Sequence, residues 1–498
     1  MHLNCLGHSS HPQPPHPRSK QKKKTKKNKT MMMMTKLSLV RQPLARAQSS
    51  IAAAVSTYPS YVLNAPATEV TTLPSGLRVA SEGSHGETAT VGVWIGAGSR
   101  YETAQNNGAA HFLEHMAFKG TSKRTQHQLE LEIENMGGHL NAYTSREQTV
   151  YYAKVFKKDV PRAMDILSDI LQNSKLDEAA IERERDVILR EMEEVNKLQE
   201  EVVFDRLHET AFMGNGLGRT ILGPTENIRN LKKSDLQDYI ATHYTAPRMV
   251  IAGAGAVDHS QLVELAQKSF GELPTTPAVA PTLELVRFVG SDVRVKDDSM
   301  PLAHVALAFE GFSWTSEHSF PLLIMQTLLG SWDRTSGAGM NMSSKLGQVV
   351  AEKELAHSYM SFNTCYQDTG LFGVYAVADK YKLNDLTWYT MEALVRLVHK
   401  TTDDEVERAK VQLKANMLMQ LDGSSPICED IGRQMLTYGR RMTPAEIFAR
   451  IDAVDAAAVR LTADEVINDK EHALAAIGPI HELPDYNFIR RRSYWLRY

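Results

Sequence analysis

The sequence predicts an α+β fold of two homologous lobes, α/β sandwiches that arose by internal duplication and enclose a cleft. Strand-like segments alternate with long helical segments through most of the 498 residues. Weakly similar segments recur in the same order about 216 residues apart, as in a duplicated unit. A Pro-rich stretch lies between the two copies and suits neither a helix nor a central strand.

The first copy begins with strands and continues with helices. Residues 71–82 alternate around a Pro-Ser-Gly turn, and residues 90–95 read TVGVWI, which favours a strand. Helices are expected at residues 109–119, 126–136, 160–173, 177–212 and 233–243.

The second copy repeats this pattern. Strand-like segments at 291–295, 305–309 and 372–376 echo those at 75–79, 91–95 and 151–155. Helices are expected at residues 321–329, 383–400 and 403–421. We therefore predict a basic leader at 1–60, a catalytic zinc-binding lobe at 61–270, a linker at 271–283 and a non-catalytic lobe at 284–498.

The leader differs in charge from the rest of the chain. Residues 1–68, which include the leader, contain 11 Lys or Arg and no acidic residue, whereas all 59 Asp and Glu follow. Residues 1–30 are either an extension upstream of a true start among residues 31–34 or a basic nucleic-acid or nuclear-import patch. From Met34 the segment is amphipathic and rich in Arg, Ser and Ala, which is typical of a mitochondrial transit peptide. For the acidic body we expect no nucleic-acid partner.

The composition also excludes a membrane-spanning protein and a metal site with cysteine ligands. The longest uncharged apolar stretch, residues 249–257, has nine residues, and a membrane span needs about 20. The chain has three cysteines, which are far apart and form no CxxC pair, so a metal site here must use His and carboxylate ligands.

His111, Glu114 and His115 form the motif HxxEH in a segment expected to be helical. Residues at i and i+4 share a helix face, so both imidazoles can reach one ion, and Glu114 projects beside them. Two imidazoles suit Zn²⁺, and a carboxylate that is not a ligand can take a proton from water on the metal. Asn106 and Asn107 are N-cap residue types for this helix. The alternative is that the two histidines and the glutamate lie on a helix surface and bind no metal.

The helix expected at 177–212 offers a further ligand. At about 100° per residue, Glu184 and Glu191 fall in its apolar arc. The opposite, solvated face carries Glu182, Glu193 and Glu200. A buried carboxylate is costly unless it is paired or binds a metal, so a nearby zinc site would explain the pattern. An inward ion pair with an Arg is the alternative.

The motif HFLEH, with Glu191 following His115 by 76 residues, resembles the pitrilysin-type metallopeptidases. This family includes the mitochondrial processing peptidases and the core subunits of ubiquinol-cytochrome c reductase. The resemblance runs from about residue 71 to the C-terminus and includes residues 137–142, 363–373, 421–432, 438–441 and 483–486. It implies two similar α+β lobes around a chamber.

The resemblance also implies the roles of the site residues. His111, His115 and Glu191 would bind one Zn²⁺ per chain, Glu114 would be the general base, and Glu184 would be a second catalytic-site carboxylate that orients the site. A separate strand prediction concerns Asn141, Ala142 and Tyr143. The edge of the strand that contains these residues could bind an extended substrate peptide by β-augmentation. The equal alternative is an ordinary strand of the sheet.

The second lobe departs from a catalytic pattern. At the position corresponding to the motif, residues 328–332 read LLGSW and cannot bind zinc. Many relatives have an Arg and a Tyr where this chain has Ala351 and His357, so a catalytic contribution from this lobe is in doubt. The long glycine-rich loop of the processing peptidase α subunit is also missing, which implies a separate α subunit.

By resemblance, we expect a zinc-dependent endopeptidase that removes N-terminal presequences from imported mitochondrial precursor proteins. It would be the catalytic β subunit of an αβ heterodimer in the mitochondrial matrix, with basic presequence peptides as substrates. The alternative is a core scaffold subunit of the respiratory ubiquinol-cytochrome c reductase complex, peripheral on the inner membrane. Both functions can reside in one chain.

Overall fold

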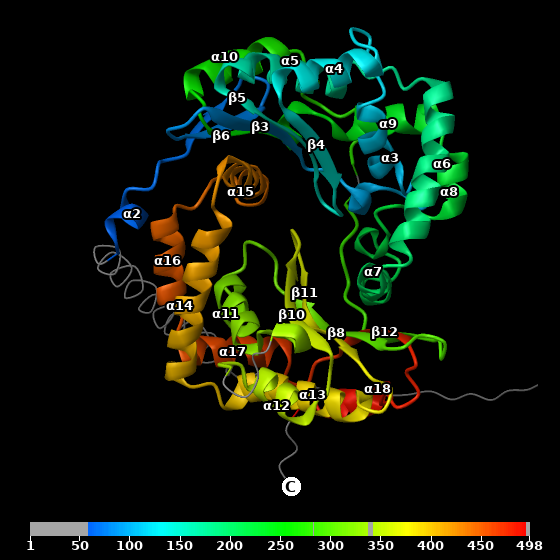
Figure 1. Cartoon of the computed structure of the whole chain (residues 1–498), viewed down its shortest axis with the longest axis vertical. Coiled ribbons are helices and arrows are strands. Elements are labelled where there is room, and N and C mark those ends of the chain that lie inside the picture. The colour runs from blue at the N-terminus through cyan, green and yellow to red at the C-terminus, as the bar shows by residue number, and fades with distance from the viewer. Residues whose placement is uncertain (1–57, 282, 337–341, 495–498) are drawn as a thin grey trace, which may run out of the picture. The chain divides into compact units, whose positions relative to one another are not determined.

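The computed structural model describes residues 58–281, 283–336 and 342–494. The predicted leader therefore lies almost wholly outside the described residues. Residues 58–498 form one compact unit that contains two six-stranded sheets (Figure 1). In the described part of the chain, no helix is long and apolar enough to cross a membrane.

The first sheet has the strand order β1-β2-β6-β3-β5-β4. Its strands are β1 (Glu69–Thr72), β2 (Arg78–Gly83), β3 (Thr88–Ile95), β4 (His139–Thr144), β5 (Thr149–Phe156) and β6 (Met249–Gly255). The pair β2–β6 is parallel and every other pair is antiparallel.

The second sheet repeats this topology with the order β7-β12-β8-β11-β10-β9. Its strands are β7 (Ser291–Lys296), β8 (Ala303–Gly311), β9 (Ser331–Asp333), β10 (Ser358–Cys365), β11 (Gly370–Ala378) and β12 (Ala473–Gly478). The pair β7–β12 is parallel, as β2–β6 is in the first sheet. The shared order of five strands confirms the two-lobed α+β fold, and β1 and β9 are additions at opposite ends.

Helices follow the strands in a matching sequence in each half. The first half contains α2 (Ser60–Leu63), α3 (Ala109–Ala117), α4 (Gln126–Met136), α5 (Val160–Gln172), α6 (Glu178–Val195), α7 (Gln199–Ala211), α8 (Thr225–Asn230), α9 (Lys233–His243) and α10 (His259–Phe270). The second half contains α11 (Ser319–Leu329), α12 (Lys345–Lys353), α13 (Leu383–His399), α14 (Asp403–Gln420), α15 (Ser424–Thr437), α16 (Pro444–Asp452), α17 (Ala456–Val466) and α18 (Tyr486–Arg491). By order and position, α3 corresponds to α11, α6 to α14 and α7 to α15.

One face of each sheet packs on helices from its own half. In β3, the alternating residues Val91, Val93 and Ile95 are buried in one core cluster with residues of α5. The alternation places successive side chains on opposite faces of the strand. The same arrangement recurs in β8, where Val305 and Leu307 belong to the core cluster that includes α13 and α17.

The other face of each sheet is covered by a helix from the opposite half (Figure 1). Helix α15 packs on Ala252 and Ala254 of β6, and helix α7 packs on Ala306 and Ala308 of β8. Small side chains let the helix axis approach the sheet closely. At Gly432 of α15 an added Cβ would lie 2.1 Å from the Trp94 ring, so only glycine fits without a shift. The two halves thus exchange equivalent helices.

The helix predicted at 177–212 is wrong as a single element. It breaks into α6 and α7, and Leu198 at the break is 57% exposed. The reason is tertiary, because Val203, Leu207 and Ala211 are buried against the second sheet and α7 must leave the direction of α6 to reach it.

Residues 271–283, the predicted linker, contain no helix or strand in their described part. The domain boundaries themselves stay a prediction.

Candidate metal centre

Helix α3 is fixed at its start by a buried carboxylate. Glu102 accepts hydrogen bonds from the backbone N–H groups of Gly108 at 2.9 Å and Ala110 at 2.7 Å, and from the Asn107 side chain at 2.7 Å. These N–H groups lie in the first turn, where a helix has no internal acceptors. Gly108 enters the helix with φ 103°, and no asparagine side chain caps it. The prediction of an Asn cap is wrong, because Glu102 supplies the acceptor.

Three predicted ligands converge between α3 and α6. The Nε2 atom of His115 lies 3.1 Å from Oε2 of Glu191, and Nε2 of His111 lies 3.7 Å from the same oxygen. One ligand atom from each of the three residues lies within 4.8 Å of the others. Zn–N and Zn–O bonds of about 2.0–2.2 Å place tetrahedral ligand atoms about 3.4 Å apart. The donor set and its spacing therefore fit a zinc ion.

Glu184 lies behind His115 rather than in the cluster. Its Oε2 atom is 3.3 Å from Nδ1 of His115, and its Oε1 atom is 2.8 Å from the ammonium of Lys119. A carboxylate on Nδ1–H leaves the lone pair on Nε2 pointing to the metal side. The buried Glu184 thus forms an ion pair, the alternative given from the sequence, but with Lys119 and not with an Arg. It also contacts His115, one of the predicted ligands.

Burial and charge set the protonation of the cluster. Burial, helped by the neighbouring His115, lowers the pKa of His111, which keeps its imidazole neutral and able to donate a lone pair. For His115, burial opposes protonation, but the carboxylates of Glu191 and Glu184 outweigh it and raise the pKa. The hydrogen bond from His115 lowers the pKa of Glu191, which stays ionised.

Glu114 stands beside the cluster without joining it. Thr144 at the end of β4 donates a hydrogen bond to Oε2 of Glu114 at 2.7 Å. Burial raises the pKa of Glu114, which suits a group that must accept and return a proton. Thr144 was not predicted from the sequence, although it directly follows the predicted substrate strand.

Asn141, Ala142 and Tyr143 lie in β4, at the edge of the first sheet. Among the described residues β4 pairs with β5 alone, so its other edge has no strand partner. The hydroxyl of Tyr143 donates to Glu429 of α15. The edge meets the geometric requirement for β-augmentation, and the substrate-binding role of the three residues stays a prediction.

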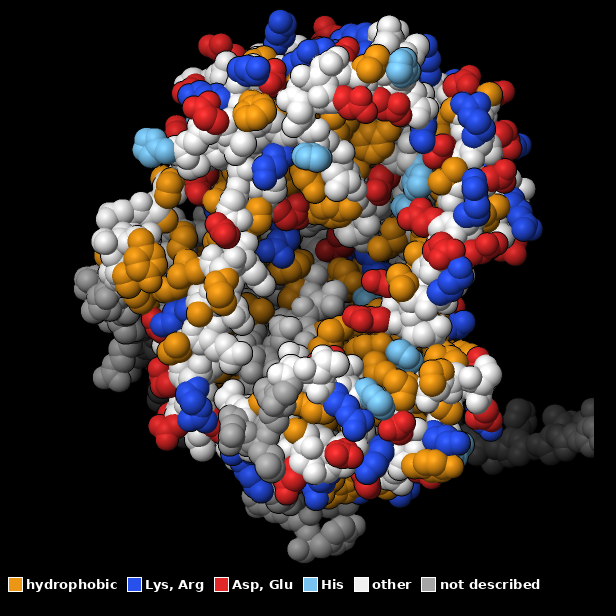
Figure 2. Space-filling view, in the orientation of Figure 1, with side chains coloured by type: hydrophobic (Ala, Val, Ile, Leu, Met, Phe, Trp, Pro, Cys, Tyr) orange, Lys and Arg blue, Asp and Glu red, His pale blue; other side chains and the backbone are white. Residues whose placement is uncertain are grey.

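The helical-wheel prediction for α6 and its continuation agrees with the exposure of the side chains. Glu184 is 7% exposed and Glu191 is half-buried, whereas Glu182, Glu193 and Glu200 are exposed. Figure 2 shows acidic and basic side chains intermingled along the right edge, where α6 lies in Figure 1. The carboxylates on the two sides of this helix therefore have different environments.

The second half has no comparable cluster in the described ranges, where the set of His111, His115 and Glu191 is the one that could hold a metal. Residues 328–329 end α11 with two leucines. Other histidines have structural partners, as expected. His208 is buried against the Phe204 carbonyl and the Tyr366 hydroxyl, and His357 lies 3.2 Å from Asp379.

Two family models match the chain. The model described as insulinase (peptidase family M16) matches residues 78–225, and the model described as peptidase M16 inactive domain matches residues 230–413. The first match contains all the residues of the metal cluster. The second covers much of the half that lacks it.

Curated relatives are similar over most of the chain. A probable mitochondrial-processing peptidase subunit beta of Arabidopsis thaliana is 58% identical over 88% of this chain and 83% of its own length. The mitochondrial-processing peptidase subunit beta of Mus musculus is 58% identical over 88% of this chain and 90% of its own. A chain in the solved structure titled "Complex III2 from Candida albicans, Inz-5 bound" is 27% identical, with a TM-score of 0.78, and covers 86% of this chain and 100% of its own.

Proposed function

Since the chain belongs to the insulinase family of peptidases, family M16, we propose that it is a zinc-dependent endopeptidase that removes N-terminal presequences from mitochondrial precursor proteins. It would act as the catalytic β subunit beside an α subunit, on the matrix side of the inner membrane. The relatives named as beta subunits, at 58% identity, support this assignment.

His111, His115 and Glu191 would hold the zinc ion, and Glu184 would orient His115 through its Nδ1 atom. When bound, the ion supplies a Lewis acid that acidifies water and polarises the scissile carbonyl. The ammonium of Lys119 pairs with the second oxygen of Glu184 and holds this carboxylate in place.

Glu114 would move the proton. Its carboxylate would take a proton from the attacking water and return it to the leaving amine as the peptide bond breaks. Thr144 holds one oxygen of Glu114, so the other oxygen is the one available to water. Because Thr144 ends β4, a peptide paired along the β4 edge would lie next to this carboxylate.

The observation that carries the proposal is the convergence of two imidazoles and a carboxylate beside the separate carboxylate of Glu114. The test is the substitution Glu114→Gln in the heterodimer with an α subunit. Cleavage of a presequence peptide should fall by about 10³-fold while zinc content stays unchanged.

The matched control is Glu193→Gln, which neutralises an exposed carboxylate of α6 outside the cluster. It should cleave at the wild-type rate. A Glu114→Gln heterodimer that retains wild-type cleavage would refute the role of Glu114 as the base.

A second function is favoured by one observation, the 0.78 TM-score to a chain of a respiratory complex III. The chain would then be a core subunit peripheral on the inner membrane, with or without peptidase activity. Native electrophoresis of mitochondria separates the two proposals. Migration only with the cytochrome complex supports the core role, and migration as a free heterodimer supports the processing role.

A further inference from the structure

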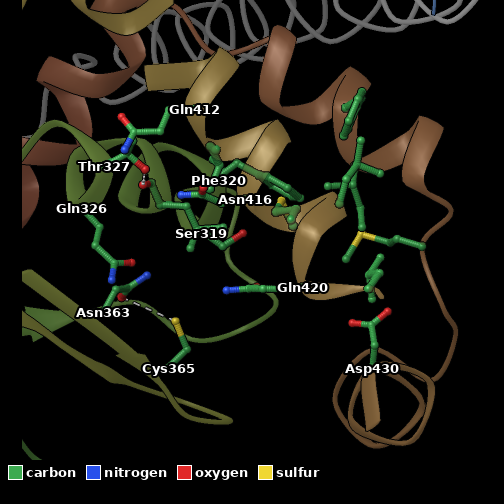
Figure 3. A pocket seen from close by; sticks show the side chains of 18 of the residues that line it. Ser319, Phe320, Gln326, Thr327, Asn363, Cys365, Gln412, Asn416, Gln420 and Asp430 are labelled. Atoms are coloured by element: carbon green, nitrogen blue, oxygen red, sulfur yellow. Dashed lines mark hydrogen bonds between the residues drawn. The ribbon is translucent and has the colours of Figure 1, made fainter. Parts of the chain in front are cut away.

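The second half has a cavity at the place that corresponds to the metal cluster. In the first half the cluster lies between α3 and α6, next to the edge strand β4. Their counterparts in the second half are α11, α14 and β10, and these elements together with α15 line a cavity of about 770 Å³ (Figure 3). The position that holds the metal cluster in the first half is thus a cavity in the second half, where the described residues form no comparable cluster.

A row of three side-chain amides faces this cavity. Gln412, Asn416 and Gln420 follow one another at intervals of four residues along α14, and all three line the cavity. Figure 3 shows them along one helix, with Gln420 extending toward Asn363 and Cys365 of β10. None of the three amides has a hydrogen-bond partner among the described residues. Each therefore offers both a donor and an acceptor to a ligand.

The spacing of the row matches an extended peptide. Four residues of helix rise about 6 Å, and two residues of an extended chain span about 6.6–6.8 Å. The small difference lies within the reach of flexible Gln side chains. An amide donates and accepts at once, as a peptide group does, so alternate peptide groups of an extended chain can pair with successive members of the row.

The charged groups of the wall are already paired within the protein. Asp430 accepts from Arg441 at 3.0 Å and from Gln434 at 2.9 Å, and Glu429 accepts from the Tyr143 hydroxyl. Arg433 lies 3.5 Å from Asp430. The polar groups left for a ligand are thus mainly neutral, which favours a peptide backbone over a charged head group or a metal ion.

The rest of the wall is apolar and adaptable. It includes Phe320, Leu323, Met417, Met442 and Phe448. Methionine side chains are flexible and fit side chains of different shape. A site with this composition binds the backbone through the amides and accepts varied apolar side chains.

We propose that this cavity, which we call the amide pocket, binds an extended segment of the peptide substrate that lies remote from the scissile bond. The proposal rests on the proposed peptidase function. The Tyr143–Glu429 hydrogen bond joins β4 beside the metal cluster to α15 in the wall of the amide pocket. One peptide can follow this connection from the cluster to the pocket, without a requirement for a particular sequence in the remote segment.

The test compares a short and a long substrate. The heterodimer with an α subunit is given a peptide of about 12 residues around a cleavage site, and a peptide that extends the same site by about 15 residues, which reach roughly 50 Å in extended form. The triple variant Gln412→Met, Asn416→Leu and Gln420→Met removes the amides and keeps side-chain size. The KM of the long peptide should rise about tenfold, with kcat and the KM of the short peptide unchanged.

Two controls separate the amide row from general effects. Gln267→Met replaces an exposed glutamine of α10 outside the pocket and should change neither peptide's KM. Long peptides with single ester bonds in the remote segment lose one backbone donor each. Esters at alternate positions should weaken binding to the wild type and leave binding to the triple variant unchanged. If the triple variant does not fold, the dependence of wild-type binding on the position of the ester tests the proposal by itself. Equal binding of all the ester peptides would then overturn it.

Direct binding distinguishes the two proposals. The Kd of the long fluorescent peptide is measured by anisotropy for the Glu114→Gln heterodimer with and without the triple substitution. An unchanged Kd overturns the amide pocket even if cleavage is normal. If neither peptide is cleaved by the wild type but the Kd rises tenfold on removal of the amides, the amide pocket stands and the proposed peptidase function fails.

Discussion

The two halves of the chain share a topology and differ in the chemistry of two helices. In both, a parallel strand pair is followed by the same order of antiparallel strands. The metal cluster of the first half and the amide pocket of the second lie between equivalent helices. In the first half α3 and α6 present imidazoles and carboxylates, and in the second half α11 and α14 present leucines and amides. The scaffold sets where a site lies, and a few side chains on two helices decide whether it could hold a metal.

The largest expected effect comes from removing the feature that distinguishes the halves. Glu191→Gln takes away the carboxylate shared by both imidazoles. Cleavage should fall to background and bound zinc should be lost, as measured by metal analysis after dialysis. Glu184→Gln acts through His115 and should weaken zinc binding by a smaller factor, about 10–100-fold. Equal zinc affinity in all variants would contradict the assigned ligand set.

The second prediction tests the packing of α15 on the sheet of the opposite half. Gly432→Ala places a methyl group against the Trp94 ring, which is 1% exposed and enclosed by the sheet and α15. We expect a loss of about 3 kcal/mol in the free energy of unfolding, measured with urea. Gly96→Ala, where the nearest atom is 3.5 Å away, is the matched control and should change stability little. Equal effects of the two substitutions would show that α15 does not pack as described.

The third prediction concerns the pH dependence of stability, to which one buried histidine in each half contributes. Burial lowers the pKa of His243 and of His472 to about 4, and neither ring nitrogen of His472 makes a hydrogen bond to a described residue. A histidine in the unfolded chain has a pKa near 6.5. Folding therefore favours the neutral form of both histidines, and their contribution to the free energy of unfolding is fully present above pH 6.5. Stability should fall as pH drops from about 6.5 towards 4, by up to about 1.4 kcal/mol per unit for each histidine.

His472→Phe keeps a ring stacked on Tyr486 and removes one of these titrations. Urea unfolding at pH 7, 6 and 5 should show a shallower pH dependence for the variant. An identical slope in the wild type and the variant would exclude His472 as a source of acid sensitivity.

The smallest effect concerns the residue that holds Glu114. Thr144→Val removes the hydroxyl that donates to this carboxylate and keeps the shape of the side chain. A lost hydrogen bond to the ionised form raises the pKa of Glu114 further, so the acidic limb of the kcat profile should move to higher pH, with kcat lower by about tenfold. Thr144→Ser retains the hydroxyl and should behave as the wild type. An unshifted limb in Thr144→Val would contradict the contact.

The sequence predicted the parts of the site that depend on helical periodicity. His111 and His115 share a face because they are four residues apart, and the apolar arc correctly separated Glu184 and Glu191 from the exposed Glu182. Strand alternation and the repeat of segments likewise predicted two α+β lobes, because both signals are local.

Contacts between distant segments could not be predicted in this way. Glu102 binds the start of α3 from before the helix, and Thr144 reaches Glu114 from another element. The break at Leu198 follows from packing on a sheet whose first strand begins at residue 291 and whose last strand ends at residue 478, beyond any local pattern. The helices that were not identified include α15, which carries the exchange between the halves. The others are α2, α8, α10, α12, α16, α17 and α18.

The exchange of α7 and α15 bears on how the chain could be divided. A cut in residues 271–283 would give one fragment with α7 and no cover for the face of its sheet that α15 occupies, and a second fragment with the opposite defect. Each fragment would expose a sheet face made of small apolar residues, and each would carry the helix that the other needs. The two pieces are therefore complementary, and co-expressed without a peptide link they should reassemble into one particle, as split proteins do, whereas either piece alone should aggregate.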